Sequence, residues 1–353
     1  MAMPSDVAPD ALSGGLLDPN DPRWQRFVDR CPDALPFHQP AWMTTLAECY
    51  GFRPFVVAVG AADGDIRGGI PLMELSDPVR GRRWTALPFT DRCPPLLAGA
   101  EAVEPLAAAI RLAAADARIG RVEVRSPLPG FALGAVATVQ ELDLSPGADE
   151  VERGFSSAAR RNTRKARREG VVVRTSDAET DLIDAYYALH LLSRRRLGVP
   201  VQPRRFFRRL WTHMLQPGRG HLLLASVNGD PIAGVVLLYA GQTVVYKYGA
   251  SDARAWGLRP NNLLFTEAIR WSAEAGYASF DFGRSDFADQ GLRAFKLGWG
   301  AEERPLVYGE LGSGHAHGDG REGRGGRFLG DVIRRSPTWV CRSAGELLYR
   351  FAA

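Results

Sequence analysis

The sequence is poor in cysteine and lacks the short motifs of the common nucleotide- and metal-dependent enzymes. Its 353 residues include four cysteines, and no two form a Cys-x-x-Cys pair, which excludes a zinc knuckle and a thioredoxin-like site. The sequence contains no P-loop, no Gly-x-Ser-x-Gly turn and no His-Glu-x-x-His pair. Asp281-Phe282-Gly283 spells the magnesium motif of protein kinases, but none of the other kinase motifs accompanies it.

Long apolar runs and a strong excess of one charge are also missing. The most apolar window is interrupted at residues 228–231 by Asn-Gly-Asp-Pro, which indicates a hairpin turn and not a membrane span. The first residues show no basic segment followed by an apolar one, so we expect no secretory signal, and we expect reduced thiols in a cytoplasmic protein. The net charge of +4 is small for a protein that coats DNA, and we expect no DNA partner.

An alternation of helical and strand patterns is present, and it occurs twice. It predicts an α/β fold, an α+β mixed sheet with helices on both faces. The first pass has a helix, two strands, a Pro-rich segment, a helix and a strand, and the second pass is a longer version. We expect a leader with a short helix (1–36), an N-terminal subdomain (37–148), a C-terminal domain (149–311), a Gly-rich linker (312–327) and an amphipathic helix (328–353).

The histidines do not predict a metal site. His315 and His317 lie in the Gly-rich linker, and no cluster of cysteines or carboxylates there completes a set of ligands. His190, His213 and His221 lie on or beside apolar helices and strands and are interpreted as structural. The basic C-terminal helix either packs on the body of the protein or lies on an anionic membrane surface.

The third quarter of the chain carries the most informative motifs. A strand with two tyrosines leads to a loop and a long helix, and the next strand ends in an acidic-aromatic-Gly sequence. A Phe-Lys pair and a Trp-Gly pair follow. These residues are Tyr246, Tyr248, Pro260, the helix at 262–275, Asp281-Phe282-Gly283, Phe295-Lys296 and Trp299-Gly300. The run resembles the FemAB-like and cellulose-biosynthesis-type acetyltransferases of the GNAT superfamily, and the resemblance covers roughly residues 37–311.

The resemblance implies a tandem GNAT fold of two similar subdomains and transfer of an acyl or aminoacyl group to an amine. GNAT enzymes hold a pantetheine arm along splayed strands and a pyrophosphate at a helix N-terminus, where N–H groups and the dipole favour anions. Asn261 and Asn262 begin the corresponding helix, with Arg254 and Arg259 on the approaching loop.

The donor stays open between two substrates. The loop SDARAWGLRP lacks the Arg/Gln-x-x-Gly-x-Gly/Ala signature that cradles the coenzyme A pyrophosphate. The FemAB relatives lack it too, and those that modify peptidoglycan take their group from aminoacyl-tRNA. Acyl-CoA is the expected donor and aminoacyl-tRNA the alternative, with no permanently bound cofactor.

The segment SSAARRNTRKARREG, residues 156–170, predicts a strongly basic helix that ends at Gly170. Arg160, Arg164 and Arg168 recur at spacing four on one face, and Lys165 lies on the adjacent face. No aromatic residue is interleaved, so the helix would contact phosphate and not stack on bases. It is either a solvated helix that packs one narrow side, or a contact for the phosphates of tRNA, coenzyme A or a nucleotide- or lipid-linked pyrophosphate.

Two charged residues follow the long helix. Asp281 is the candidate catalytic group, because transfer to an amine needs a base or a water chain to take the amine proton. The alternative for Asp281 is a carboxylate that caps the following turn. Lys296 would bind a phosphate or an oxyanion, or it is a surface lysine beside a buried Phe295.

The remaining candidates would line the substrate cleft. Alternation places Tyr246 and Tyr248 on one face of a strand, either in the core or in the cleft wall. Arg284 and Ser285 follow Asp281 as polar residues, and Asp91 in LPFTD resembles a loop near the acceptor groove of relatives.

Together these features predict a GNAT-family N-acyltransferase that uses neither a covalent enzyme intermediate nor a metal. The expected acceptor is an amino sugar, an amino acid or a lipid-linked precursor, in cell-envelope or exopolysaccharide biosynthesis. One alternative is a FemAB-type, tRNA-dependent aminoacyltransferase acting on a peptidoglycan precursor, and another is a non-catalytic GNAT-like subunit of polysaccharide assembly. We expect a cytoplasmic protein, either free or peripheral to the membrane.

Overall fold

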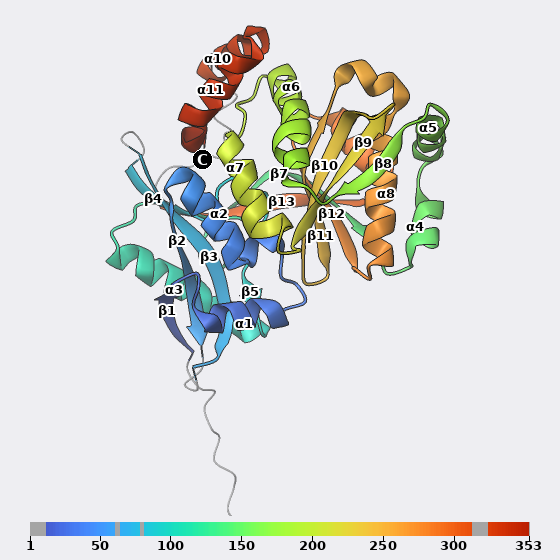
Figure 1. The fold of residues 1–353 in the computed structure, drawn as a ribbon. Coiled ribbons are helices and arrows are strands. Elements are labelled where there is room, and N and C mark those ends of the chain that lie inside the picture. Colours follow the sequence, from blue (N-terminus) through green and yellow to red (C-terminus); the bar gives the residue numbers. More distant parts are fainter. Residues whose placement is uncertain (1–11, 61–63, 78–80, 313–323, 353) are drawn as a thin grey trace, which may run out of the picture. The chain divides into compact units, whose positions relative to one another are not determined.

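The computed structural model describes residues 12–60, 64–77, 81–312 and 324–352, which group into two compact units (Figure 1). Unit 1 comprises residues 1–43, 52–134 and 307–315, and unit 2 comprises residues 44–51, 135–306 and 316–353. The chain therefore leaves unit 1 near residue 134 and returns to it near residue 307. The predicted subdomains were continuous in sequence, and this return was not anticipated.

Unit 1 is a mixed sheet covered by a helix. Its strands lie in the order β1 (Ser13–Leu17), β2 (Arg53–Gly60), β3 (Ile66–Asp77), β4 (Gly81–Thr85), β6 (Val122–Val124) and the end of β13 (Glu302–Leu311), with β5 (Leu96–Leu97) also on β3. The helices of unit 1 are α1 (Pro22–Arg30), α3 (Val103–Asp116) and the start of α2 (Pro40–Tyr50), whose residues from Thr44 on belong to unit 2. Alternate residues of β2 and β3, such as Val57 and Ile70, are fully buried with Leu106 and Ile110 of α3. Each such side chain contributes about 1.5–3 kcal/mol to folding.

The predicted leader contains a strand. β1 pairs antiparallel with β2 from Ser13 opposite Gly60 to Leu17 opposite Val56. The helix expected near Trp24 is α1, whose N-cap carboxylate, that of Asp21, accepts the backbone N–H of Arg23.

Unit 2 has a second group of strands, in the order β7 (Ala132–Asp143), β12 (Ser279–Ser285), β11 (Thr243–Ser251), β10 (Asp230–Ala240), β9 (Gly220–Val227) and β8 (Val172–Ser176). All neighbours are antiparallel except β11 and β12, which run parallel. The predicted hairpin between β9 and β10 is confirmed. Asn228 and Gly229 have φ values of 51° and 87°, as a two-residue turn with both central residues left-handed requires.

Helices cover both faces of this sheet (Figure 1). One face carries α4 (Ala148–Gly154), α5 (Ser157–Arg168) and α8 (Pro260–Glu274), and the other carries α6 (Tyr187–Leu197) and α7 (Arg204–Leu210). The short helix α9 (Gln290–Leu297) follows β12. Near the C-terminus the chain forms two helices, α10 (Arg324–Arg335) and α11 (Thr338–Leu348), where one was predicted, and both pack against α6.

Some predicted features lie outside the residues that the structure describes, and others are checked within those residues. His315 and His317 lie outside the described residues, as does most of the predicted Gly-rich linker. Within the part of the chain that the structure describes, no helix is both long enough and apolar enough to cross a bilayer. In the same residues, no three His, Cys, Asp or Glu side chains are grouped to hold a metal.

Candidate functional site

Two neighbouring strands of unit 2 separate halfway along their length. β11 and β12 pair from Thr243 opposite Ser279 to Val245 opposite Asp281. Beyond that point β11 continues to Ser251 and β12 to Ser285, with no further pair between them in the described ladder. The two strands therefore diverge beyond Val245 and Asp281. On β12 the carbonyls past this point already accept hydrogen bonds, those of Gly283 and Arg284 from Lys296 and that of Ser285 from Thr138.

A β-bulge lies on β11 directly after the split. Val236 of β10 is opposite Tyr248 and Leu237 is opposite Tyr246, so Lys247 is an extra residue in the strand. The ring of Tyr246 lies 4.9 Å from that of Phe265 on α8, whereas the ring of Tyr248 lies 6.0 Å from that of Phe207 on α7. The prediction that the two tyrosines share one face is wrong, because the extra residue reverses the alternation.

Tyr246 lies on the α8 side, where the two strands diverge. A Cβ at position 249 would overlap its hydroxyl oxygen, so only glycine leaves room for this phenol. Burial raises the pKa of Tyr246 to about 12, which keeps the hydroxyl protonated at neutral pH. Tyr246 can therefore offer a hydrogen-bond donor in the wall of the split.

A cavity of about 250 Å³ opens at the N-terminus of α8. Arg259 precedes the helix with a left-handed φ of 61°, and no side chain in the described structure caps the helix. Pro260 occupies the first turn, where its missing N–H costs nothing. The N–H of Asn262 donates to the carbonyl of Arg259 at 3.1 Å, and the helix dipole makes this end of α8 favourable for an anion. The cavity is lined by Asn162, Trp256, Arg259, Pro260, Asn261, Asn262 and Phe295.

The structure brings together three of the predicted donor-binding residues and leaves a fourth aside. Arg259, Asn261 and Asn262 line the cavity. Arg254 lies on the same loop, but its guanidinium is paired with Asp252 at 2.7 Å. This hydrogen-bonded pairing raises the pKa of Arg254 and lowers that of Asp252.

Three cavity residues were missed in the sequence analysis. Asn162 is the one uncharged amide within the basic segment, and Trp256 is 41% exposed on the loop before α8. The indole N–H of Trp256 donates to Ser251 Oγ at 2.9 Å, and the guanidinium of Arg196 lies 4.5 Å from the centre of the ring. A single aromatic residue in a polar loop was the available signal for Trp256.

Phe295, the third missed residue, exchanges environments with its neighbour. The alternative to a phosphate-binding Lys296 was a surface lysine beside a buried Phe295, but Lys296 is 2% exposed and Phe295 is half-buried in the cavity wall. The ammonium of Lys296 donates to the carbonyl oxygens of Gly283 at 2.7 Å and Arg284 at 3.0 Å. Lys296 thus ties α9 to the end of β12, and a role in binding phosphate stays a prediction.

Asp281 is the last paired residue of β12 before the split, and it is 3% exposed. Its Oδ1 accepts the backbone N–H of Gly283 at 2.7 Å, and Gly283 has a left-handed φ of 71°. This contact corresponds to the alternative role of a carboxylate that caps the following turn. A proton-accepting role stays a prediction.

Ser285 belongs to a buried polar network and does not project freely into the split. Its hydroxyl donates to Gln140 Oε1 at 2.8 Å, and Gln140 donates to Glu303 at 2.6 Å. Arg293 forms a two-pronged pair with Glu303, and these hydrogen bonds hold the pKa of Glu303 at about 2. The network joins β7, β12, α9 and β13.

The other two predicted cleft residues have local partners. Arg284 is paired with Asp286 at 2.9 Å. Asp91 lies in unit 1, where its carbonyl accepts the hydroxyl of Tyr308 at 2.6 Å. The Asp91 loop contains Phe89 at a left-handed φ of 59°, a strained conformation for an aromatic residue.

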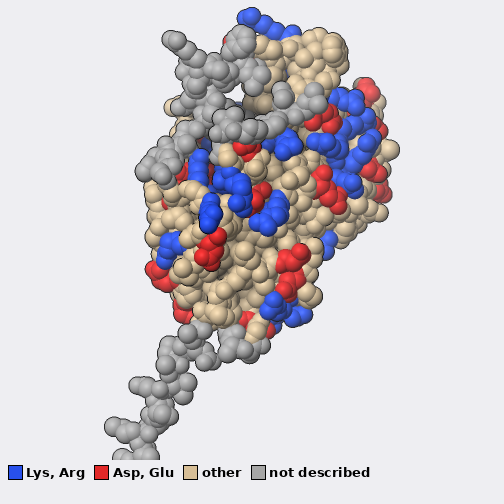
Figure 2. Space-filling model, turned by 90° about the vertical axis from the view of Figure 1, so that its left-hand side faces the viewer, with Lys and Arg blue, Asp and Glu red and all other residues tan. Residues whose placement is uncertain are grey.

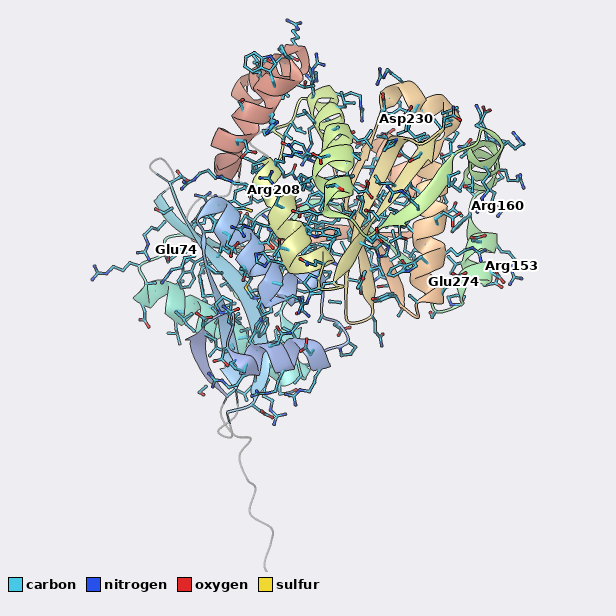
Figure 3. All side chains as sticks on the ribbon, in the orientation of Figure 1. Glu74, Arg153, Arg160, Arg208, Asp230 and Glu274 are labelled. Atoms are coloured by element: carbon cyan, nitrogen blue, oxygen red, sulfur yellow. The ribbon has the colours of Figure 1, made fainter. Side chains whose placement is uncertain are left out.

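The basic segment forms α5 as predicted and ends before Gly170, which has a φ of 78°. Its buried side chains face α8, and Thr163 Oγ1 lies 2.9 Å from Thr266 Oγ1. Arg160 donates to the backbone carbonyls of Arg153, at 2.7 Å, and Phe155, at the end of α4. Figure 3 shows Arg153 and Arg160 together at the edge of unit 2. Arg160 therefore contributes to the frame of the domain.

The other predicted phosphate contacts on α5 differ in their exposure to solvent. Arg164 and Arg168 are exposed. Lys165 is half-buried and lies three residues after Asn162, so the two residues share the side of α5 that reaches the cavity. Of the predicted α5 phosphate contacts, Lys165 is the one that the geometry supports best.

The surface charges agree with the small net charge. On the face drawn in Figure 2, Lys and Arg form clusters with Asp and Glu beside them.

A mixed sheet whose strands diverge beside an uncapped helix N-terminus is the arrangement of the GNAT class of acyltransferases. Residues 153–303 match the family described as an acetyltransferase (GNAT) domain. The structure is similar to that of FemX, with a TM-score of 0.67 and 16% identity over 84% of this chain and 96% of that one. It is also similar to a tandem GNAT protein from the clavulanic acid biosynthesis pathway, with a TM-score of 0.51 and 14% identity over 86% and 99% of the two chains.

The sequence is also similar to a lipid II:glycine glycyltransferase of Staphylococcus haemolyticus, with 34% identity over 85 residues, or 22% of this chain and 20% of that protein. The chain thus spans about a fifth of the length of the curated relatives it matches. These similarities confirm the FemAB-like resemblance and the tandem GNAT fold, and residues 153–303 match a GNAT acetyltransferase domain.

Proposed function

We propose that this protein transfers an acyl or aminoacyl group from a phosphate-bearing donor to the amine of a cell-envelope precursor. One observation carries the proposal: β11 and β12 diverge next to an uncapped N-terminus of α8. An extended donor arm can lie along β11 where this strand leaves β12. Its phosphate then lies at the helix end, where the dipole and N–H groups stabilise negative charge.

The reaction requires one bond exchange at the donor carbonyl. The acceptor amine attacks the carbonyl carbon, a C–N bond forms, and the C–S bond of a thioester or the C–O bond of an ester breaks. The amine proton ends on the departing thiol or hydroxyl. A backbone N–H where β11 leaves β12 can stabilise the oxyanion.

The donor is the first part of the proposal that needs an experiment. The match of residues 153–303 to a GNAT domain favours acyl-CoA. Aminoacyl-tRNA is the second candidate, and the observation that favours it is the similarity to proteins named as glycyltransferases. Both donors carry phosphate, at the far end of the pantetheine arm in acyl-CoA and on the terminal nucleotides in aminoacyl-tRNA, so the α8 end can serve either one.

The acceptor is proposed from the same relatives. The matched proteins are named for transfer to lipid II, which supports a lipid-linked envelope precursor as the acceptor. An enzyme of this kind would work at the membrane surface, so we propose a cytoplasmic protein that is peripheral to the membrane.

Ligand-induced stabilisation separates the two donors. Saturating acetyl-CoA, at 100 times its Kd, would stabilise the protein by about 2.7 kcal/mol and raise the melting temperature. Charged tRNA, titrated in parallel at several salt concentrations, would give a steep salt slope if it binds through several phosphates. If neither donor shifts the melting temperature at millimolar acetyl-CoA and micromolar tRNA, the proposal fails.

Arg259 tests the position of the phosphate. Arg259→Asn removes the cationic side chain and keeps a residue that tolerates the left-handed conformation. We expect it to weaken binding of the donor about five- to thirtyfold, the equivalent of about 1–2 kcal/mol. Arg254→Gln is the matched control, because Arg254 lies on the same loop but is paired with Asp252. Equal loss of affinity in both variants would move the phosphate away from the cavity.

A further inference from the structure

One surface of unit 2 combines exposed apolar side chains from several elements. Trp339 of α11 is 69% exposed and Val332 of α10 is 42% exposed. Leu197 at the end of α6 and Trp256 on the loop before α8 are 49% and 41% exposed. Large apolar side chains exposed in this number on neighbouring elements mark an interaction site.

Direct contacts connect these elements into one surface. Arg334 of α10 donates to the backbone carbonyl of Leu197 at 3.4 Å. One residue before Leu197, the guanidinium of Arg196 lies over the ring of Trp256 at 4.5 Å. Figure 1 shows α10, the end of α6 and the segment between β11 and α8 at the same end of unit 2. These contacts link α10, through the end of α6, to Trp256 in the cavity wall.

Positive charge surrounds the apolar side chains. Arg196, Arg335 and Arg342 are exposed there. Two nearby carboxylates are each already paired with an arginine: Asp331 with Arg334 at 2.7 Å and Asp252 with Arg254 at 2.7 Å. The surface thus presents unneutralised arginine charge around two tryptophans. We call it the basic–aromatic surface, and it consists of Arg196, Leu197, Trp256, Val332, Arg335, Trp339 and Arg342.

We propose that the basic–aromatic surface binds anionic lipid headgroups and holds the mouth of the α8 cavity at the membrane. Tryptophan prefers the interface, where its ring meets acyl chains and its N–H meets water, and arginine is attracted to anionic lipid. The purpose of this lipid binding is to bring the active site to an acceptor embedded in the bilayer, and that purpose rests on the proposed function. The binding itself follows from the surface alone.

Vesicle sedimentation of the purified full chain tests the proposal. We expect the protein to sediment with phosphatidylglycerol-containing vesicles, to stay in solution with phosphatidylcholine vesicles, and to be released by high salt. Trp339→Ala should weaken vesicle binding about tenfold. Arg335→Gln and Arg342→Gln should each weaken it about fivefold, which corresponds to about 1 kcal/mol per basic residue.

Controls separate lipid binding from folding and from donor binding. Leu112→Ala removes a side chain of similar exposure, 67%, from α3 of unit 1, and it should leave vesicle binding unchanged. The melting temperatures of all variants should match that of the wild type, since every substituted side chain is exposed. Acetyl-CoA binding should be unchanged in Trp339→Ala. Donor binding and vesicle binding are therefore measured separately, and failure of the donor proposal is distinguished from failure of the lipid proposal.

Two outcomes would overturn the proposal. One is that the protein sediments equally with anionic and neutral vesicles, or that it sediments with neither. The other is a loss of tRNA binding in the arginine variants while vesicle binding stays at the wild-type level, which would assign the surface to nucleic acid.

Discussion

At the scale of single residues, adjacent side chains can point into different surroundings, and these surroundings decide what a charged side chain can do. Lys296 and Phe295 are adjacent, yet the lysine is buried against two carbonyl oxygens and the phenylalanine borders a cavity. A buried ammonium is tolerated only when its hydrogen bonds are satisfied. Lys296 meets this condition because the end of β12 presents the carbonyls of Gly283 and Arg284 to it.

Substitutions at Asp281 separate a role in stabilising the turn from a role in catalysis. Asp281→Asn keeps an oxygen that can accept the N–H of Gly283, whereas Asp281→Ala removes it. We expect the alanine variant to lose about 1–3 kcal/mol of unfolding free energy and the asparagine variant to stay within about 1 kcal/mol of wild type. Chemical denaturation measures both values.

The same pair of variants decides the catalytic question. If Asp281 accepts the amine proton, Asp281→Asn should lower turnover about a hundredfold or more without unfolding. Unchanged turnover in that variant would remove Asp281 from the mechanism and leave its role in the turn.

The sequence predicted those site residues whose position depends on local structure, such as the start of a helix. Asn261 and Asn262 follow from the start of a helix, which the chain signals with Pro260. Asn162 could not be found in this way, because it reaches the cavity only when α5 packs on α8, about a hundred residues away in sequence. Trp256 and Phe295 depend on the same long-range packing.

At the scale of elements, periodicity identified most helices and strands but failed where a pattern is interrupted. The bulge at Lys247 is invisible in the letters YKYG, and it moved Tyr248 to the opposite face from the one expected. β7 was missed entirely, because ALGAVATVQELD begins with exposed residues and its buried run of four does not alternate. Residues with strong local signals, such as Asn228-Gly229, were assigned correctly.

Gly249 offers a test of the packing around this bulge. A methyl group at position 249 would overlap the hydroxyl of Tyr246, whereas one at Gly257 meets no atom within 4 Å. We expect Gly249→Ala to destabilise the protein by about 1–3 kcal/mol through overpacking, and Gly257→Ala to have little effect. Denaturant unfolding of the two variants provides the comparison, and equal stabilities would show that Tyr246 moves aside freely.

At the scale of the whole molecule, neutral histidines that are buried (His38 and His190) or half-buried (His221) couple folding to pH. Burial lowers the pKa of His38 in unit 1 to about 4. In unit 2, burial lowers the pKa of His190 to about 3 and that of His221 to about 4. Each of these rings is neutral in the native state where the unfolded chain would protonate it.

His221 gives the pH prediction. Between its unfolded pKa of 6.5 and its native pKa of about 4, the unfolded chain binds more protons than the native protein. The free energy of unfolding therefore falls as the pH is lowered through this window. His221→Phe keeps an aromatic ring against Trp271 and removes the titrating group, so its loss of stability between pH 7 and pH 4.5 should be smaller by about 2 kcal/mol. Parallel curves for the variant and the wild type would contradict the assignment.

The return of the chain to unit 1 has a consequence for the order of synthesis. The last strand of unit 1 is the end of β13, where Gly309 to Leu311 pair with β6 and Glu310 binds Arg121 at 2.8 Å. A ribosome must make all of residues 135–306 after β6 before this strand exists. At about 5–20 residues per second, unit 1 waits roughly ten to thirty seconds with β6 unpaired on that side. During translation unit 2 can thus complete its core before the unit that precedes it.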